Sequence, residues 1–168
     1  MWLVYSIESL TFDFGFLGIT PRTISGLIGI FTAPLIHGDV IHLASNTFPM
    51  VFLGSTIYIF YDKIASRIFM QCYFFPSFLV WIFGRSSTHI GASGMIYAMA
   101  FFLISFGLFR KDFRSILISI IIISLYGGLF YGVLPTESRV SWESHLMGAI
   151  VGVATASAYS RHRSVSSN

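Results

Sequence analysis

Charged residues are scarce in this chain. Asp, Glu, Lys and Arg make up only 10% of the 168 residues, whereas 55% are hydrophobic. A soluble domain carries about 25% charged residues, and the mean hydropathy here is +0.78. The net charge of +3 is small, and no basic stripe indicates a nucleic-acid partner. We therefore expect a single compact domain that is surrounded by a lipid bilayer.

Cysteine is nearly absent. Cys72 is the single cysteine, and it lies within an apolar run. One chain can therefore form neither a disulfide nor a cysteine-based metal site. A buried thiol without a neighbouring base is unreactive, so we interpret Cys72 as part of the packing.

Long apolar runs dominate the rest of the sequence. In lipid such runs form helices, because an open strand would leave backbone groups without hydrogen-bond partners. The sequence therefore predicts an all-α, polytopic membrane helical bundle over residues 1–160, followed by a disordered cytoplasmic tail, 161–168. We expect five complete transmembrane helices, within residues 41–61, 68–83, 91–109, 115–134 and 142–159. Pro49 and Pro76 predict kinks or local unwinding.

The first forty residues do not contain a complete span. Residues 1–10 are apolar but too short, because a span needs about 20 residues. We expect them to be the remnant of a first helix whose beginning is missing; partial insertion of this short segment is the alternative. Residues 11–39 are rich in glycine yet apolar, which predicts a loop with short helices in the membrane interface.

Basic residues are unequal on the two sides of this predicted topology. Loops on the cytoplasmic side of a membrane carry more Lys and Arg than those on the other side. The side that is richer in basic residues is therefore predicted to be cytoplasmic, and the C-terminus lies on it. The richer side has seven basic residues and the other has three. The seven are Lys63, Arg67, Arg110, Lys111, Arg114, Arg161 and Arg163, and the three are Arg22, Arg85 and Arg139.

Four histidines lie near the outer ends of the segments: His37, His42, His89 and His145. Strongly polar groups within a membrane are costly and indicate a site, although a single interfacial histidine can simply bond water or a carbonyl. Histidine also binds zinc. No His-Glu-x-x-His pattern occurs, so we expect no metal and no cofactor.

His42 and Asn46 are four residues apart, which places them on one face of a helix. Both side chains can donate hydrogen bonds. Two donors directed into a cavity meet the need of an oxyanion hole, and a contact between helices explains a buried asparagine equally well.

Ser93 lies between Gly91 and Gly94, where a polar loop enters an apolar segment. Small neighbours permit a close approach of substrate or of another helix, and the free N–H groups of a helix start attract an anion. Helix capping is the simpler interpretation of this serine. Tyr97 lies one turn further along the same face, where it can orient an imidazole or pack in the core.

His145 is followed by Gly148 and Gly152. This spacing permits close helix packing, and packing against Gly94 and Ala98 would bring His145 to Ser93. A serine needs such a base to act as a nucleophile. The carboxylates all lie in predicted loops or at helix ends, so we expect none to be buried and predict a Ser–His dyad without a third acidic member. Glu143 is nearest in sequence but does not face His145.

These motifs together resemble the rhomboid intramembrane serine proteases. The resemblance rests on residues 37–46, on Gly91-Ala92-Ser93-Gly94 and on His145-Leu146-Met147-Gly148, and it covers about residues 15–160. The family's Trp-Arg pair in the long first loop is absent, and residues 29–32 stand in its place.

The resemblance implies a role for each matching residue. Ser93 would be the nucleophile and His145 its general base. His42, Asn46 and the Ser93 N–H would form the oxyanion hole, and Tyr97 would stack beneath His145. Gly91 would shape the active-site turn, Gly148 would allow close helix packing with Gly94 as a further supporting residue, and His37 would have a structural role.

The predicted function is that of an intramembrane serine endopeptidase that cleaves transmembrane segments of other membrane proteins without a cofactor. We expect a multi-pass protein of a bacterial inner membrane whose active site opens to the non-cytoplasmic side. One alternative is a non-catalytic rhomboid-like protein that binds transmembrane clients. An unrelated transporter subunit is a further alternative, but it would leave the Ser–His pairing as coincidence.

Overall fold

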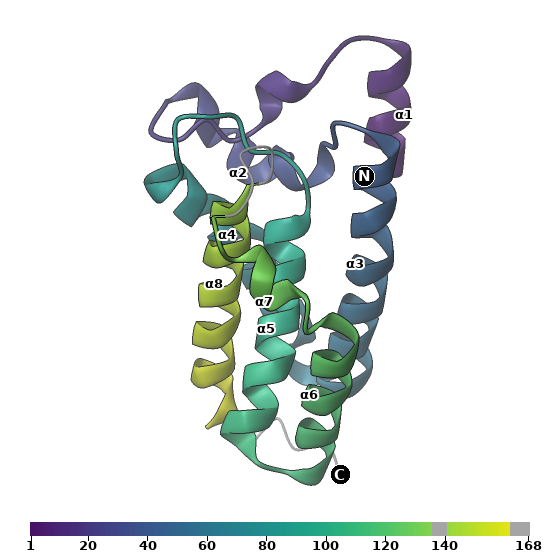
Figure 1. Ribbon diagram of the computed structural model, residues 1–168, viewed down its shortest axis with the longest axis vertical. Coiled ribbons are helices and arrows are strands. Elements are labelled where there is room, and N and C mark those ends of the chain that lie inside the picture. Colours follow the sequence, from purple (N-terminus) through teal and green to yellow (C-terminus); the bar gives the residue numbers. More distant parts are fainter. Residues whose placement is uncertain (136–140, 162–168) are drawn as a thin grey trace.

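The computed structural model describes residues 1–135 and 141–161, and this part of the chain is helical without a strand. It confirms the all-α prediction (Figure 1). The α-helices are α1 Trp2–Leu10, α2 Gly29–Thr32, α3 Val40–Phe60, α4 Asp62–Phe83, α5 Ser93–Arg110, α6 Phe113–Tyr126, α7 Leu129–Gly132 and α8 Trp142–Ser160. Three 3-10 turns precede α3: η1 Gly15–Leu17, η2 Ser25–Leu27 and η3 Ala33–Leu35.

Helices α3, α6 and α8 each begin at a polar side chain that accepts a backbone N–H of the first turn. Asp39 accepts from the N–H of His42, Asp112 from that of Ser115, and Ser141 from that of Ser144. Such caps satisfy donors that the first turn leaves free. The cap at Ser141 fixes the start of α8 one turn before His145.

Helix α5 forms the centre of the bundle. Every residue from Gly94 to Gly107 is buried except Phe101, and the helix lies among α3, α4, α6 and α8 (Figure 1). Phe102 and Phe106 of α5 are fully buried in the main core. A helix that is apolar on all sides belongs inside a bundle, so the composition of α5 accounts for its place.

Helices α5 and α8 pack so closely that two glycines of α8 are required. A Cβ atom at Gly148 would overlap the carbonyl oxygen of Gly94, and one at Gly152 would overlap that of Ala98. The four-residue spacing places both glycines on the same face of α8. This packing sets the first turn of α8 beside the first turn of α5.

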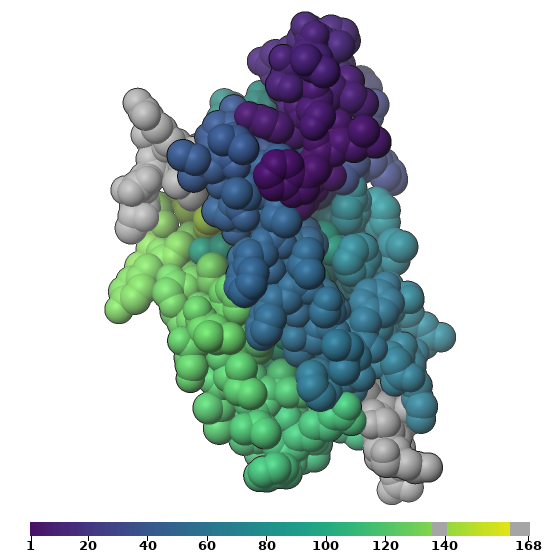
Figure 2. All heavy atoms as spheres, turned by 90° about the vertical axis from the view of Figure 1, so that its right-hand side faces the viewer, coloured from purple at the N-terminus to yellow at the C-terminus, as the bar shows by residue number. Residues whose placement is uncertain are grey.

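Residues 11–39 form the expected loop with short helices, at the end of the bundle where α5 and α8 begin (Figure 1). Helix α1 lies against the start of α3, where the Trp2 indole N–H donates to the Thr47 hydroxyl at 3.0 Å (Figure 2). The loop is tied to the segment before α5, because Ile19 and His89 exchange backbone hydrogen bonds, each of 2.9 Å.

Two predicted segments have wrong boundaries. Helix α4 begins at Asp62 rather than near residue 68, because Ile64 and Ala65 are buried while Lys63 and Arg67 remain exposed on the other face. The fourth apolar segment is not one helix: α6 ends at Tyr126, and α7 begins after Gly127 and Gly128. Glycine weakens a helix interior, and two in succession end this one. Helices α3 and α4 continue through Pro49 and Pro76 without unwinding.

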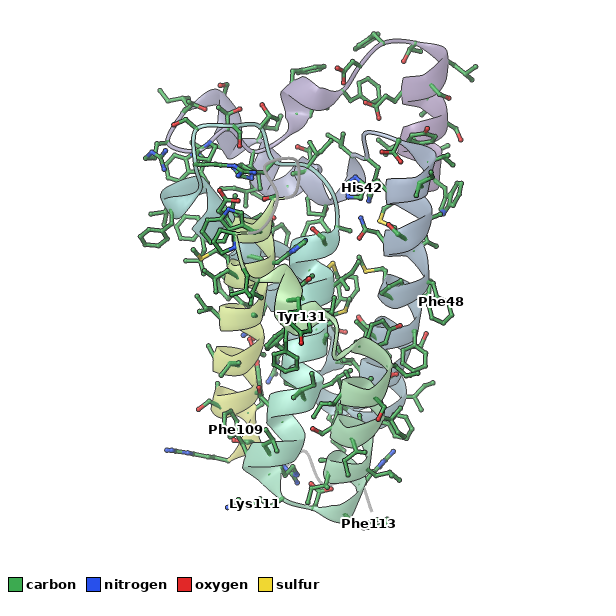
Figure 3. The ribbon with its side chains drawn as sticks, viewed as in Figure 1. His42, Phe48, Phe109, Lys111, Phe113 and Tyr131 are labelled. Carbon is green, nitrogen blue, oxygen red and sulfur yellow. The ribbon has the colours of Figure 1, made fainter. Side chains whose placement is uncertain are left out.

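Three helices in the described part of the chain are long and apolar enough to cross a membrane: α3, α4 and α5. Helix α6 is shorter, at 14 residues. Large apolar side chains also cover the outer surface, as Phe48 does on α3 (Figure 3). Ile120 on α6 is exposed as well. An apolar exterior of this extent suits lipid as the solvent, and the protein is a membrane protein.

The glycine contacts between α5 and α8 predict the effect of a single added methyl group. Gly152→Ala should lower the free energy of unfolding by about 1–3 kcal/mol, because the new Cβ overlaps the α5 backbone. Gly54→Ala is the matched control, since a Cβ at this buried helical glycine meets no atom within 4 Å. The free energy of unfolding of both variants is measured in detergent micelles by circular dichroism. An equal loss in Gly152→Ala and Gly54→Ala would contradict the close packing of α8 on α5.

Candidate functional site

A cavity of about 650 Å³ lies between the first turns of α3, α5 and α8. Figure 3 shows His42 at this end of the bundle, while Lys111 lies at the opposite end. Five of the predicted site residues line the cavity: His42, Asn46, Ser93, Tyr97 and His145. The structure therefore gathers polar groups from three helices around one space.

Ser93 is the first residue of α5, and its side chain does not cap the helix. Ala92 occupies the N-cap position, and no side-chain capping bond is present there. Within residues 1–135 and 141–161, the Ser93 hydroxyl makes no hydrogen bond, so none joins it to His145. The half-buried hydroxyl is open to the cavity.

The ring of His145 is held by two contacts. It stacks on the ring of Tyr97 with a centroid distance of 4.1 Å and an interplanar angle of 3°. Its Nδ1 lies 2.9 Å from the carbonyl oxygen of Gly132. Since a carbonyl oxygen only accepts, Nδ1 must carry the proton. The neutral ring therefore has its lone pair on Nε2, where it can accept a proton.

Gly132 is a residue that the sequence did not single out. A Cβ atom at this position would overlap the Tyr97 hydroxyl and would lie 3.3 Å from His145 Nδ1. The absence of a side chain thus lets the backbone of α7 approach the stacked pair. No sequence signal indicates this role, because Gly132 lies in a run of apolar residues after α6.

His42 and Asn46 converge on the turn that precedes Ser93. Gly91 has a positive φ of +101°, which glycine adopts without strain. A Cβ atom there would lie 2.7 Å from the His42 ring and 3.7 Å from Asn46 Nδ2. Asn46 is 6% exposed, and its Nδ2 is a buried donor without a hydrogen-bond partner in the described residues. Burying an unsatisfied donor is costly, so this amide is able to bond a group that enters the cavity.

The remaining predicted residues lie beside the cavity and do not line it. Gly94 and Gly148 form the contact between α5 and α8. His37 packs edge-on against His42, with ring centroids 4.9 Å apart. Its side chain is buried, and neither ring nitrogen has a partner among the described residues. Burial, assisted by His42, lowers the pKa of His37 from 6.5 to about 4.

The expectation that no carboxylate is buried is wrong. Glu143 is 3% exposed, and its Oε1 lies 3.2 Å from Nε of Arg85. A buried carboxylate needs such a partner, and no sequence pattern indicates the pair because Arg85 lies in another loop. Glu143 does not line the cavity. The group that contacts Nδ1 of His145 is the carbonyl oxygen of Gly132 and not a carboxylate.

The fold and this cavity define a helical membrane protein that places serine, histidine and amide side chains together at one end of its bundle. A comparison with known families matches residues 25–162 to the Rhomboid domain. The chain belongs to the rhomboid family.

Two similar relatives are uncharacterized mycobacterial proteins. One, from Mycobacterium tuberculosis, is 34% identical over 156 residues, which is 83% of this chain and 62% of the relative. One from Mycobacterium leprae is 34% identical over 174 residues, which is 93% of this chain and 66% of the relative. The chain thus spans a little under two thirds of the length of these relatives.

The buried His37 predicts a pH dependence of stability. The unfolded chain protonates this histidine near pH 6.5 and the folded protein only near pH 4, so protons favour unfolding between these values. The free energy of unfolding should therefore decrease as the pH is lowered through this window, by up to about 1.4 kcal/mol per pH unit. His37→Gln should remove this part of the slope, because the substituted side chain does not bind a proton in this pH range while every other residue is unchanged. The free energy of unfolding is measured by SDS titration at several pH values. The same pH dependence in the wild-type protein and in His37→Gln would contradict the prediction.

Proposed function

We propose that this protein is an intramembrane serine endopeptidase that cleaves transmembrane segments of membrane proteins with Ser93 and His145. The observation that carries the proposal is the buried Nδ2 of Asn46, which has no hydrogen-bond partner among the described residues and belongs to a residue that lines the same cavity as Ser93 and His145. A developing oxyanion in this cavity would satisfy the donor.

The proposed reaction begins when Ser93 Oγ attacks a peptide carbonyl and His145 Nε2 takes the hydroxyl proton. The negative charge on the former carbonyl oxygen is stabilised by Asn46 Nδ2, by His42 and by the free N–H of Ser93 at the start of α5. His145 then returns the proton to the leaving amine, and water hydrolyses the acyl-enzyme by the same route. Every step uses side chains and backbone of this chain.

The orientation of His145 supports this assignment of roles. The Gly132 carbonyl holds the proton on Nδ1, and the stack on Tyr97 fixes the plane of the ring. A backbone carbonyl thus orients the base, a task that a carboxylate performs in a three-member relay. Catalytic hydrogen bonds are often long before substrate binds, which reconciles the open Ser93 hydroxyl with the proposal.

The distribution of basic residues supports an active site on the non-cytoplasmic side. Lys111 lies at the end of the bundle opposite to His42 (Figure 3), and it belongs to the group of seven basic residues that predicts the cytoplasmic side. We propose a bacterial cytoplasmic membrane as the location, in keeping with the mycobacterial relatives.

The competing function is that of a non-catalytic rhomboid-like protein that binds transmembrane clients. One observation favours it: no hydrogen bond connects Ser93 with His145 in the described residues. The two functions differ in whether Ser93 is a nucleophile.

Labelling by a fluorophosphonate separates the two functions. The purified protein should be labelled at Ser93, and Ser93→Ala and His145→Ala should lose both labelling and cleavage of a model transmembrane substrate. Labelling should also decline as the pH falls, since only a neutral imidazole accepts the proton. Heat-denatured protein is the control for non-specific labelling. Absence of labelling, or unchanged labelling of Ser93→Ala, would exclude Ser93 as a nucleophile. The binding of transmembrane clients would then be the remaining function.

The Nδ2 of Asn46, a donor without a partner within residues 1–135 and 141–161, gives a second prediction. Asn46→Ala should lower kcat by about 100- to 1000-fold, as removal of one oxyanion donor does elsewhere, while the protein stays folded. Ser45→Ala is the matched control: Ser45 also lines the cavity, but its hydroxyl bonds the carbonyl of His42 in its own helix. A kcat that is equal in both variants would exclude Asn46 from the oxyanion hole.

A further inference from the structure

A chain of short hydrogen bonds joins the loop before α5 to the start of α8. His89 Nδ1 lies 2.6 Å from Ser141 Oγ, and Ser141 Oγ lies 2.6 Å from Ser144 Oγ. On the other side of the ring, His89 Nε2 lies 3.1 Å from the carbonyl oxygen of Arg85. His89 itself is buried, at 2% exposed.

The proton positions along this chain follow from the groups at its ends. The Arg85 carbonyl only accepts, so His89 Nε2 carries the proton and Nδ1 is an acceptor. Ser141 must then donate its hydroxyl proton to His89, and Ser144 donates to Ser141. In this tautomer the His89–Ser141 bond has Ser141 Oγ as its donor and His89 Nδ1 as its acceptor.

The two residues occupy equivalent places beside the reacting groups. His89 precedes Ser93 by four residues, and Ser141 precedes His145 by four. His89 belongs to a loop that is fixed to the N-terminal part of the chain by backbone bonds, namely those between Ile19 and His89 and from Gly91 N–H to the Ala33 carbonyl. The His89–Ser141 bond connects this loop to the cap of α8, and both residues line the cavity.

We propose that His89 and Ser141 are positioning residues, whose hydrogen bond sets the distance and orientation of Ser93 relative to His145. This inference rests on the proposed serine protease function. The ion pair between Arg85 and Glu143 joins the same two segments, so the fold survives loss of the His89–Ser141 bond. What changes is the alignment of the nucleophile and its base, to which reaction rates are sensitive.

The test measures inactivation of the full chain in detergent micelles by a fluorophosphonate, as kinact and KI. His89→Leu and Ser141→Ala should each lower kinact by about 10- to 100-fold with KI unchanged, and the double variant should be no slower than the slower single variant. His89→Asn should restore most of kinact, because its amide oxygen replaces the Nδ1 acceptor. Ser144→Ala is the matched control, since it keeps the His89–Ser141 bond.

The melting temperature of each variant separates positioning from stability. Lower melting temperatures together with an unchanged kinact would overturn the proposal, and so would additive effects of the two substitutions on kinact. If the wild-type protein is labelled but the His89 and Ser141 variants react equally fast, only this proposal fails. If the wild-type protein is never labelled, the proposed function fails and this inference fails with it.

Discussion

The close contact between α5 and α8 is the constraint on which the site depends. Neither Gly148 nor Gly152 can carry a side chain, because each faces a backbone carbonyl of α5. In lipid, helices associate through such packing rather than through exclusion of water. The contact places the first turns of the two helices side by side, and it is these turns that bear Ser93 and His145. The contact lies on α5, the helix that is buried along nearly its whole length.

Around this contact, two histidine rings are oriented by backbone carbonyl groups. The Gly132 carbonyl orients His145, and the Arg85 carbonyl orients His89. A backbone acceptor fixes the tautomer of a histidine without placing a second charge in a region of low dielectric, where an unpaired charge is costly. The buried carboxylate of Glu143 is instead paired with Arg85. Glu143 itself does not line the cavity, whereas its partner Arg85 does.

Much of the fold is predictable from the sequence because lipid imposes helices on apolar runs. The glycine spacing after His145 predicts the approach of α8 to α5, and that approach is observed. The break after Tyr126 was missed, because apolar residues lie on both sides of Gly127 and Gly128 and composition alone does not show where a helix ends. Gly132, the His89–Ser141 bond and the burial of Glu143 were missed for a different reason: each depends on a contact between residues far apart in the chain, which no local pattern encodes.

The central claim is that Ser93, His145 and Asn46 act on one carbonyl group. The most direct measurement is a crystal structure of the protein after reaction with a fluorophosphonate. We expect a covalent bond between phosphorus and Ser93 Oγ, with the phosphoryl oxygen within hydrogen-bond distance of Asn46 Nδ2 and the Ser93 N–H. An unmodified Ser93, or a phosphoryl oxygen that points away from Asn46, would contradict the account.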